Sequence, residues 1–193
     1  MTSTGLPDTG PQTAAGKILW HFSMSLDGFI AGPNHSMNWL NGVTASRPGL
    51  IQEYVETTGA VLGGRDGFDA YPDASATYGG AWQGPVFVLT HHPEDAPPSP
   101  GTTFLTCDVA EAARIGLEAA AGKNLEIFSA SIGRQLLARN LIDEIDLHIA
   151  PVLLGDGIRL FDNPGGSPIP LELLNGDIPS VEINVRYRPV RTR

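Results

Sequence analysis

The sequence predicts an α/β fold, and three observations indicate it. Residues 125–150 contain an apolar strand, a turn of small residues, a helix and a second strand, which is the order of a βαβ unit. Short apolar segments and helical segments also alternate before this unit, from residue 17 onward. The last segment, from Val181 to Arg188, alternates apolar and polar side chains, as a half-buried antiparallel strand does. A chain of 193 residues is long enough to form one such domain with a sizeable core.

Composition narrows the class of protein. A net charge of −9 argues against a nucleic-acid or anionic-membrane partner, which would need a basic patch. Cys107 is the single cysteine, so an intramolecular disulfide and a cysteine-based metal cluster are excluded. Residues 1–16 resemble a flexible tail rather than a signal peptide, and no apolar run is long enough to cross a membrane. We therefore expect a soluble cytoplasmic protein with one domain over residues 17–193.

The first strand, Lys17–Leu26, has an unusual polar face. Ile18, Trp20, Phe22 and Met24 share one face, which is ordinary for a buried strand. The other face carries His21 and Ser23, although strands in α/β sheets are normally apolar on both faces. Two interpretations stay open: these side chains line a pocket, or His21 is a hydrogen-bonded core histidine. Asp27 and Gly28 end the strand in a turn, where Asp27 has a structural role.

The remaining elements follow from periodicity and from turn residues. We expect a helix over 47–58, a short strand over 60–63, a long loop over 66–84, a strand over 85–89, a strand over 103–105, a helix from Asp108 to Gly122, and a helix running to Asn140. A further strand alternates from Glu144 to Ile149 and offers surface for pairing with a second copy. Gly116 lies inside a helix and indicates close packing there.

The turn Ser129-Ala130-Ser131 stands where a strand gives way to a helix. The N-terminus of a helix presents free backbone N–H groups and the positive end of the helix dipole, so it can receive phosphate. Serine is also a common N-cap residue, and the turn can equally be a simple cap.

Four segments make the sequence resemble the dihydrofolate-reductase-like superfamily, in the branch related to the reductase domain of bacterial riboflavin biosynthesis. They are 25–31 (SLDGFIA), 63–65 (GGR), 86–91 (VFVLTH) and 126–161, of which 141–144 (LIDE) and 151–161 (PVLLGDGIRLF) are the most specific. This resemblance implies a three-layer sandwich with a mixed, mostly parallel central sheet and helices on both faces. It also implies NADPH across the strand ends, with NADH as a possible substitute, and a homodimer.

The resemblance implies roles for particular residues. His21 is the proton donor or acid/base catalyst. The cofactor-binding positions are Ser23, Ile30, Gly64, Arg65, Thr90, His91, Ser129, Ala130, Ser131 and Ile132. The substrate-binding positions are Trp39, Tyr54 and Leu154. We expect no metal site, because the adjacent His91 and His92 have no third ligand at a suitable spacing.

The sequence departs from the family at three places. Ser129-Ala130 replaces the usual Gly-Gly pair, and Gly67 replaces a threonine that contacts the cofactor phosphates. The usual substrate-binding acid is missing near Arg47, which argues against dihydrofolate as substrate. No phosphosugar-binding basic cluster is recognised either, so the riboflavin-pathway substrate is not expected.

Three functions are compatible with these residues. The first is an NAD(P)H-dependent reductase that transfers a hydride to a small heteroaromatic or carbonyl-type substrate. The second is a non-redox biosynthetic enzyme that has lost NADPH binding and uses His21 as acid/base, because side chains at Ser129 and Ala130 obstruct a pyrophosphate. The third is a small-molecule binding protein without chemistry.

Overall fold

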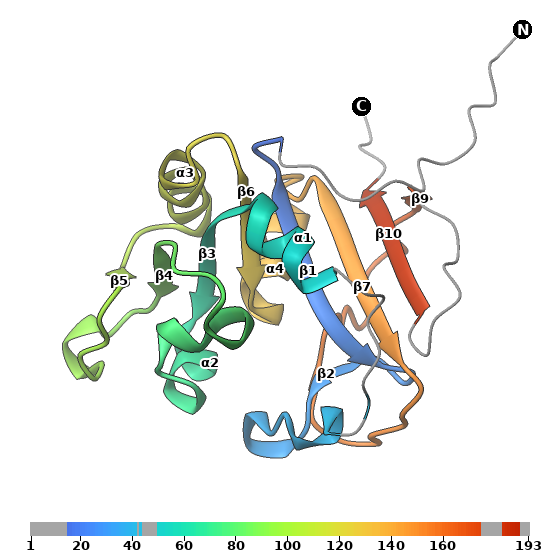
Figure 1. The fold of residues 1–193 in the computed structure, drawn as a ribbon. Coiled ribbons are helices and arrows are strands. Elements are labelled where there is room, and N and C mark those ends of the chain that lie inside the picture. The colour runs from blue at the N-terminus through green and yellow to red at the C-terminus, as the bar shows by residue number, and fades with distance from the viewer. Residues whose placement is uncertain (1–14, 42, 44–49, 175–182, 190–193) are drawn as a thin grey trace, which may run out of the picture.

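The computed structural model describes residues 15–41, 43, 50–174 and 183–189, and its centre is an eight-stranded mixed sheet (Figure 1). The strand order is β5-β4-β3-β6-β1-β7-β10-β9. The six strands from β5 to β7 are mutually parallel, and β10 and β9 complete the sheet in antiparallel pairing. The strands are β1 Ile18–Ser25, β3 Thr58–Gly64, β4 Val86–Leu89, β5 Thr102–Leu105, β6 Asn124–Phe128, β7 Glu144–Ala150, β9 Leu171–Leu173 and β10 Ile183–Pro189.

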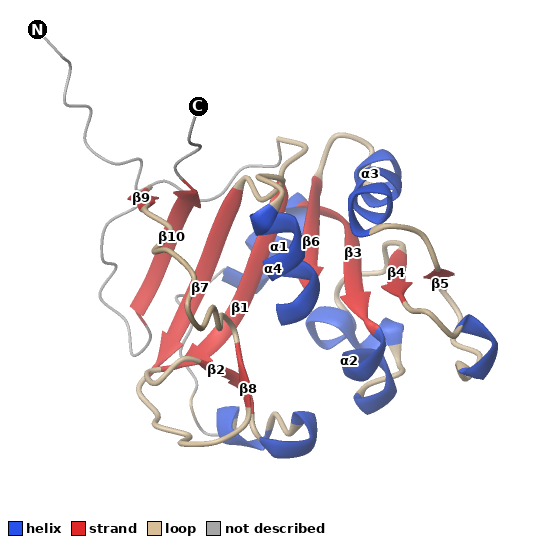
Figure 2. Cartoon of the chain, turned by 180° about the vertical axis from the view of Figure 1, so that it is seen from behind, coloured by secondary structure: helices blue, strands red, loops and turns tan. Residues whose placement is uncertain are grey.

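A small second sheet and four α-helices surround the main sheet (Figure 2). The second sheet pairs β2 (Phe29–Ala31) with β8 (Ile158–Arg159). The α-helices are α1 Leu50–Thr57, α2 Arg65–Ala70, α3 Val109–Ala119 and α4 Ala130–Ala138, and the 3-10 segments are η1 Pro33–His35, η2 Asn38–Leu40, η3 Ala74–Gly80 and η4 Pro93–Asp95. The α/β sandwich with a mostly parallel sheet confirms the predicted fold class.

One face of the sheet is apolar and carries α3 and α4. Trp20, Leu125 and Leu136 are almost fully buried in this core. Two helical glycines let the helices approach the sheet closely. A Cβ on Gly116 would lie 2.6 Å from Leu125 Cδ1, and a Cβ on Gly133 would lie 2.0 Å from Trp20 Cε2. The close packing expected at Gly116 is therefore confirmed.

The opposite face of the sheet is polar but equally buried. Tyr54 of α1 packs on Leu19 and stacks on His21, with ring centroids 4.0 Å apart. The polar residues of β7 also point here, and Glu144 and His148 are 3% and 4% exposed. The expectation that strand 144–149 offers surface for a second copy is therefore wrong. The strand lies between β1 and β10, so its alternation reflects a polar interior, not a solvated face.

Several element boundaries differ from the sequence-based expectations. The long loop predicted over 66–84 is wrong, because α2 and η3 lie within it. Helix α2 was missed because it has only six residues and contains Gly67, which is a poor helix former. Of the helix predicted over 47–58, residues 47–49 lie outside the described part of the chain, as do residues 181–182 of the last strand.

Asn124 ties the start of the described chain to the sheet. Its side-chain oxygen accepts hydrogen bonds from the backbone N–H groups of Ala15 and Lys17, each at 3.2 Å. Residues 1–14 of the predicted tail lie outside the described residues. Within the described part, no helix has the length and apolar character needed to traverse a lipid bilayer.

Candidate active site

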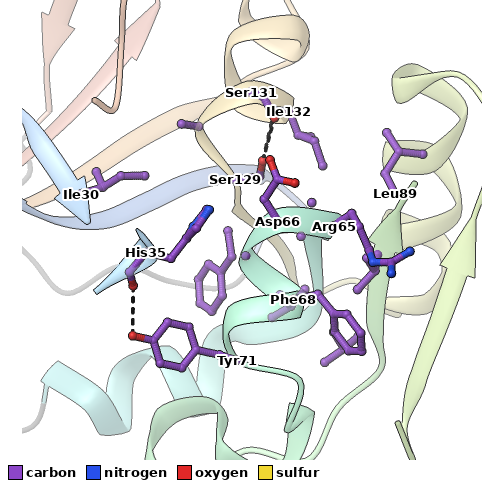
Figure 3. Close-up of a pocket in the computed structure, with 18 of the residues that line it drawn as sticks. Ile30, His35, Arg65, Asp66, Phe68, Tyr71, Leu89, Ser129, Ser131 and Ile132 are labelled. Atoms are coloured by element: carbon purple, nitrogen blue, oxygen red, sulfur yellow. Dashed lines mark hydrogen bonds between the residues drawn. The ribbon is translucent and has the colours of Figure 1, made fainter. Parts of the chain in front are cut away.

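A groove of about 1300 Å³ crosses the sheet at the carboxyl ends of its parallel strands (Figure 3). Its walls come from the ends of β1, β3, β4 and β6, from the starts of α2 and α4, and from β2 and η1. Ligands of open α/β sheets bind in such crevices, because the helix N-termini there present N–H groups. The groove is therefore the candidate active site.

The groove brings together every residue predicted to bind the cofactor. Its lining includes Ser23, Ile30, Gly64, Arg65, Thr90, His91, Ser129, Ala130, Ser131 and Ile132, and the predicted catalytic residue His21. These residues come from five separate segments of the chain, and the parallel pairing of β3, β6 and β1 aligns their ends.

The three predicted substrate-binding residues do not line this groove. Tyr54 is 2% exposed, and its hydroxyl is engaged by Asp146 and His148 beneath α1. Leu154 is half-buried and uses its backbone N–H to bind Asp27. Trp39 is half-buried in η2. None of the three therefore lines the groove, and their predicted role in substrate binding stays a prediction.

The N-terminus of α4 is capped by Ser129. The Ser129 hydroxyl accepts the Ile132 N–H at 3.3 Å and lies 3.1 Å from the Ser131 hydroxyl. The Ser129 carbonyl accepts the indole N–H of Trp20 at 3.2 Å. The cap interpretation of this turn is confirmed. Because the same residues line the groove, the cap occupies an N–H group that a phosphate would otherwise reach.

The side chain of Ala130 lies mostly in the core. It is 7% exposed and belongs to the apolar core, although it also forms part of the groove wall. Gly64 is more constrained, because a Cβ there would lie 3.0 Å from the Ser129 hydroxyl oxygen. The ends of β3 and β6 therefore meet at Gly64 and Ser129 with little room for a larger side chain.

Arg65 connects α2 to the segment after β4 at one end of the groove. Its guanidinium donates to the carboxylate of Asp69 at 2.7 Å, to the carbonyl of His92 at 2.7 Å and to the carbonyl of Asp95 at 3.0 Å. Thr90 steadies the same segment by accepting the His92 N–H at 3.1 Å. The guanidinium of Arg65, ion-paired with Asp69, is thus fixed beside the residues that follow β4.

His21 reaches the groove from within a buried polar network. Its Nε2 lies 2.9 Å from His148 Nε2, while its Nδ1 lies 3.3 Å from the Tyr78 hydroxyl and 3.5 Å from Glu126 Oε2. Tyr54 covers one face of the imidazole ring. His21 is 8% exposed and is a wall residue of the groove. The two alternatives for His21 are therefore not exclusive: it is a hydrogen-bonded core histidine that also borders the pocket.

Glu126 is the acidic centre of this network and was not predicted. It is fully buried, and its carboxylate accepts hydrogen bonds from the hydroxyls of Thr58 and Tyr78. Burial, together with the negative charge of Glu126, raises the pKa of Tyr78 well above its ordinary value. Sequence reasoning missed Glu126 because it stands inside an apolar strand. The signal that could have indicated it is the unexplained polar face of β1 beside it.

Asp27 links the turn after β1 to the segment before β8. Its carboxylate accepts the Ser25 hydroxyl at 2.6 Å and the backbone N–H groups of Leu154 and Gly155 at 3.1 and 2.7 Å. These bonds, that of Ser25 foremost, lower the pKa of Asp27 to about 2. The structural role predicted for Asp27 agrees with this geometry.

Tyr71 joins two segments at the rim of the groove by hydrogen bonds (Figure 3). Its hydroxyl donates to the carbonyl of His35 at 3.0 Å and accepts the N–H of Met37 at 3.2 Å. The segment after β2 is thereby attached to the segment after α2, and both His35 and Met37 line the groove.

Comparisons with known proteins agree with this architecture. Residues 117–175 match the model of the RibD C-terminal domain. The uncharacterized protein YwjB of Bacillus subtilis is 26% identical over 147 residues, which cover 75% of this chain and 82% of that protein.

Three solved structures share the fold. A proposed riboflavin biosynthesis protein of Shewanella sp. PV-4 has a TM-score of 0.72 at 22% identity, covering 91% of this chain and 99% of that one. A diaminohydroxyphosphoribosylaminopyrimidine deaminase/5-amino-6-(5-phosphoribosylamino)uracil reductase of Thermotoga maritima has a TM-score of 0.65 at 16% identity. It covers 92% of this chain, which spans only 57% of that protein.

The third structure is a dihydrofolate reductase of Enterococcus faecalis in complex with NADP(H), with a TM-score of 0.55 at 11% identity. It covers 93% of this chain and 100% of that one. The chain therefore has the dihydrofolate-reductase-like fold, and its resemblance to the branch that contains the RibD C-terminal domain is confirmed.

Proposed function

We propose that this protein is an NAD(P)H-dependent reductase that transfers a hydride to a small heteroaromatic or carbonyl-type substrate. The observation that carries the proposal is the groove itself: all ten residues expected to bind the cofactor line one continuous crevice across the strand ends. The structural likeness to a dihydrofolate reductase complexed with NADP(H) supports the same assignment.

The residues present fit a dinucleotide phosphate. Arg65 offers a fixed positive charge at the end of the groove beyond β3 and β4, and Thr90 and His91 stand beside it. The start of α4 offers backbone N–H groups and the positive end of a helix dipole. The absence of a side chain at Gly67 leaves open space, since no atom lies within 4 Å of the position of a Cβ there.

The cofactor, when bound, supplies the hydride, and the protein positions the reacting groups and excludes water. Ser23, Ile30 and Phe128 border the groove next to His21, where the nicotinamide and the substrate would meet. His21 presents an imidazole to the groove at this point and is the proposed proton donor. Its Nδ1 has the longer contacts, so this nitrogen is the one that can exchange a protein partner for a substrate atom.

Titration with NADPH and NADH, followed by nicotinamide fluorescence or calorimetry, tests the proposal directly. We expect saturable NADPH binding in the micromolar range. A panel of small carbonyl and heteroaromatic compounds can then be screened for oxidation of the bound NADPH. An absence of binding at millimolar concentrations of both nucleotides would contradict the reductase function.

We also propose that the protein is a homodimer. Large apolar side chains are exposed between β7 and the start of β9. Leu153 is 71%, Phe161 42% and Leu171 42% exposed. Exposed side chains of this size and apolar character support an association site. Sedimentation equilibrium at micromolar concentration should give twice the mass of one chain.

A further inference from the structure

The polar face of the sheet carries polar groups that a hydride transfer alone does not use. Five are buried and Tyr78 is half-buried; they are Thr58, Tyr54, Tyr78, Glu126, Asp146 and His148, which come from β3, α1, η3, β6 and β7. Hydrogen bonds join each of them to His21, directly or through one or two other members. Of the whole network, only His21 also lines the groove. Any proton that passes between the network and the groove must therefore pass through His21.

The hydrogen-bond partners determine where the proton between the two histidines lies. The Tyr54 hydroxyl donates to Asp146 Oδ2 at 2.7 Å, so its oxygen can only accept from His148 Nε2 at 3.0 Å. His148 Nε2 therefore carries a hydrogen. The 2.9 Å between the two Nε2 atoms has room for one hydrogen, so Nε2 of a neutral His21 carries none.

The proton of a neutral His21 must then be on Nδ1. The partners of Nδ1 agree with this placement, because both are acceptors. Glu126 is a fully buried carboxylate, and the Tyr78 hydroxyl has already directed its own hydrogen to Glu126. Glu126 and His148 thus hold opposite sides of one imidazole ring, and the tautomer follows from the bond that each makes.

We propose that Glu126 and His148 are positioning residues that fix the proton of His21 on Nδ1 and favour the binding of one further proton by the His21–His148 pair. The pair that holds this further proton is called the loaded pair below. This inference rests on the reductase function proposed above. In the loaded pair, each Nδ1 carries one proton and the two Nε2 atoms share a third. The fully buried carboxylate of Glu126 lies against the resulting positive charge.

For a C=O or C=N substrate, bound NAD(P)H would supply the hydride of the new C–H bond, and the π electrons of the double bond move to the oxygen or nitrogen. This atom takes the Nδ1 proton of His21, and the shared proton stays on the Nε2 side, so the pair returns to neutrality. The Tyr78 hydroxyl can then turn from Glu126 to the bare Nδ1, which is 3.3 Å away. A proton from bulk solvent, arriving through the groove, restores the charge of the pair after the product leaves.

Nitrogen-15 NMR of histidine-labelled protein tests the tautomer without cofactor or substrate. At a pH where the ring is neutral, the spectrum of His21 should show a protonated Nδ1 and a bare Nε2. Glu126→Gln should reduce the Nδ1-protonated fraction, because an amide can donate to Nδ1 in place of accepting from it. Glu126→Asp keeps the charge and should keep the tautomer. Glu144→Gln is the matched control, since Glu144 is a buried carboxylate of the same sheet that binds Lys17 instead of His21.

A His21 that is protonated on Nε2 in the natural protein overturns the proposal, even if no variant folds. The same holds if the tautomer is identical in natural protein and Glu126→Gln. The kinetic part uses any compound from the panel that supports NADPH oxidation. Glu126→Gln and His148→Gln should lower kcat more than tenfold and leave the Kd of NADPH within twofold. An unchanged kcat overturns the positioning role. A protein that fails to bind NADPH overturns the reductase function instead, and the NMR result then stands separately.

Discussion

Gly133 lies directly against the indole ring of Trp20, so that a Cβ on Gly133 would fall 2.0 Å from Trp20 Cε2 and 2.2 Å from Nε1. The same Nε1 donates to the carbonyl of Ser129, the residue that caps α4. The close packing of α4 on β1 and the geometry of the Ser129-Ala130-Ser131 turn therefore depend on one glycine.

Gly133→Ala should destabilise the protein by about 1–3 kcal/mol, the usual cost of forcing extra atoms into a packed core. Chemical denaturation of the two proteins measures the difference. Gly67→Ala is the control, because no atom lies within 4 Å of its added Cβ and alanine favours a helix. Equal stability of natural protein and Gly133→Ala would contradict the packing described here.

Arg65→Ala should weaken NADPH binding more than tenfold. A charge-assisted contact with phosphate contributes about 1.5–3 kcal/mol, and NADPH has a phosphate that NADH lacks. NADH should therefore lose less affinity, which calorimetry with both nucleotides can measure. Arg65 also holds the carbonyls of His92 and Asp95, so the thermal stability of the variant must be measured beside its affinity. Equal losses for both nucleotides would show that Arg65 acts only through this loop.

Ser129→Gly should tighten NADPH binding, because removal of the hydroxyl frees the Ile132 N–H for phosphate. Glycine is itself a tolerated N-cap, so stability should fall by only a few tenths of a kcal/mol. Ser129→Ala should cost about 1 kcal/mol instead, since alanine is a poor cap. Weaker NADPH binding in Ser129→Gly would mean that the hydroxyl itself binds the cofactor.

Protonation of Asp27 at acid pH should weaken the hydrogen bonds that hold the segment before β8. The pKa of Asp27 is lowered from 3.8 to about 2, so its ionised form favours the folded state. This contribution is complete above about pH 4, declines as the pH falls through the pKa of about 2, and is absent below it. Acid titrations of natural protein and Asp27→Asn, followed by the amide resonance of Gly155, should differ above that range and converge below it.

Alkali should act on Tyr78 in the opposite sense. Its pKa in the folded protein is raised well above 10.0, so the protonated hydroxyl stabilises the fold below the ordinary tyrosine pKa. That contribution is lost as the pH rises through the raised value. In a spectrophotometric titration, Tyr78 should therefore ionise above the ordinary range of a tyrosine. Tyr78→Phe should reduce the amplitude of this late phase.

The fold could be predicted from the sequence to the extent that local pattern determined it. Alternation identified β1 and β7, and Gly116 indicated a close helix contact, because these signals depend on neighbours along the chain. The short helix α2 could not be predicted, since its stability comes from Phe68 packing edge-on against Phe104 of β5. That contact joins residues far apart in the sequence.

The candidate site could likewise be predicted in part, where a pattern along the chain marks its residues. The positions predicted to bind a cofactor were identified because a family pattern marks them, and all of them line the groove. The network around His21 was not, because Glu126 and Tyr78 are 48 positions apart. Only the pairing of β6 beside β1 brings Glu126 to His21. A polar residue in a buried strand signals that a partner exists, but the sequence does not say which one.

The burial of Glu126 has a consequence for the order of folding. A carboxylate with no exposed surface is costly until its hydroxyl donors are in place, so the polar face can close only after Tyr78 arrives from η3. The apolar face has no such requirement. We therefore expect the strands and α4 to assemble first and the 74–80 segment to dock last, and its amides to exchange with solvent sooner than those of β6.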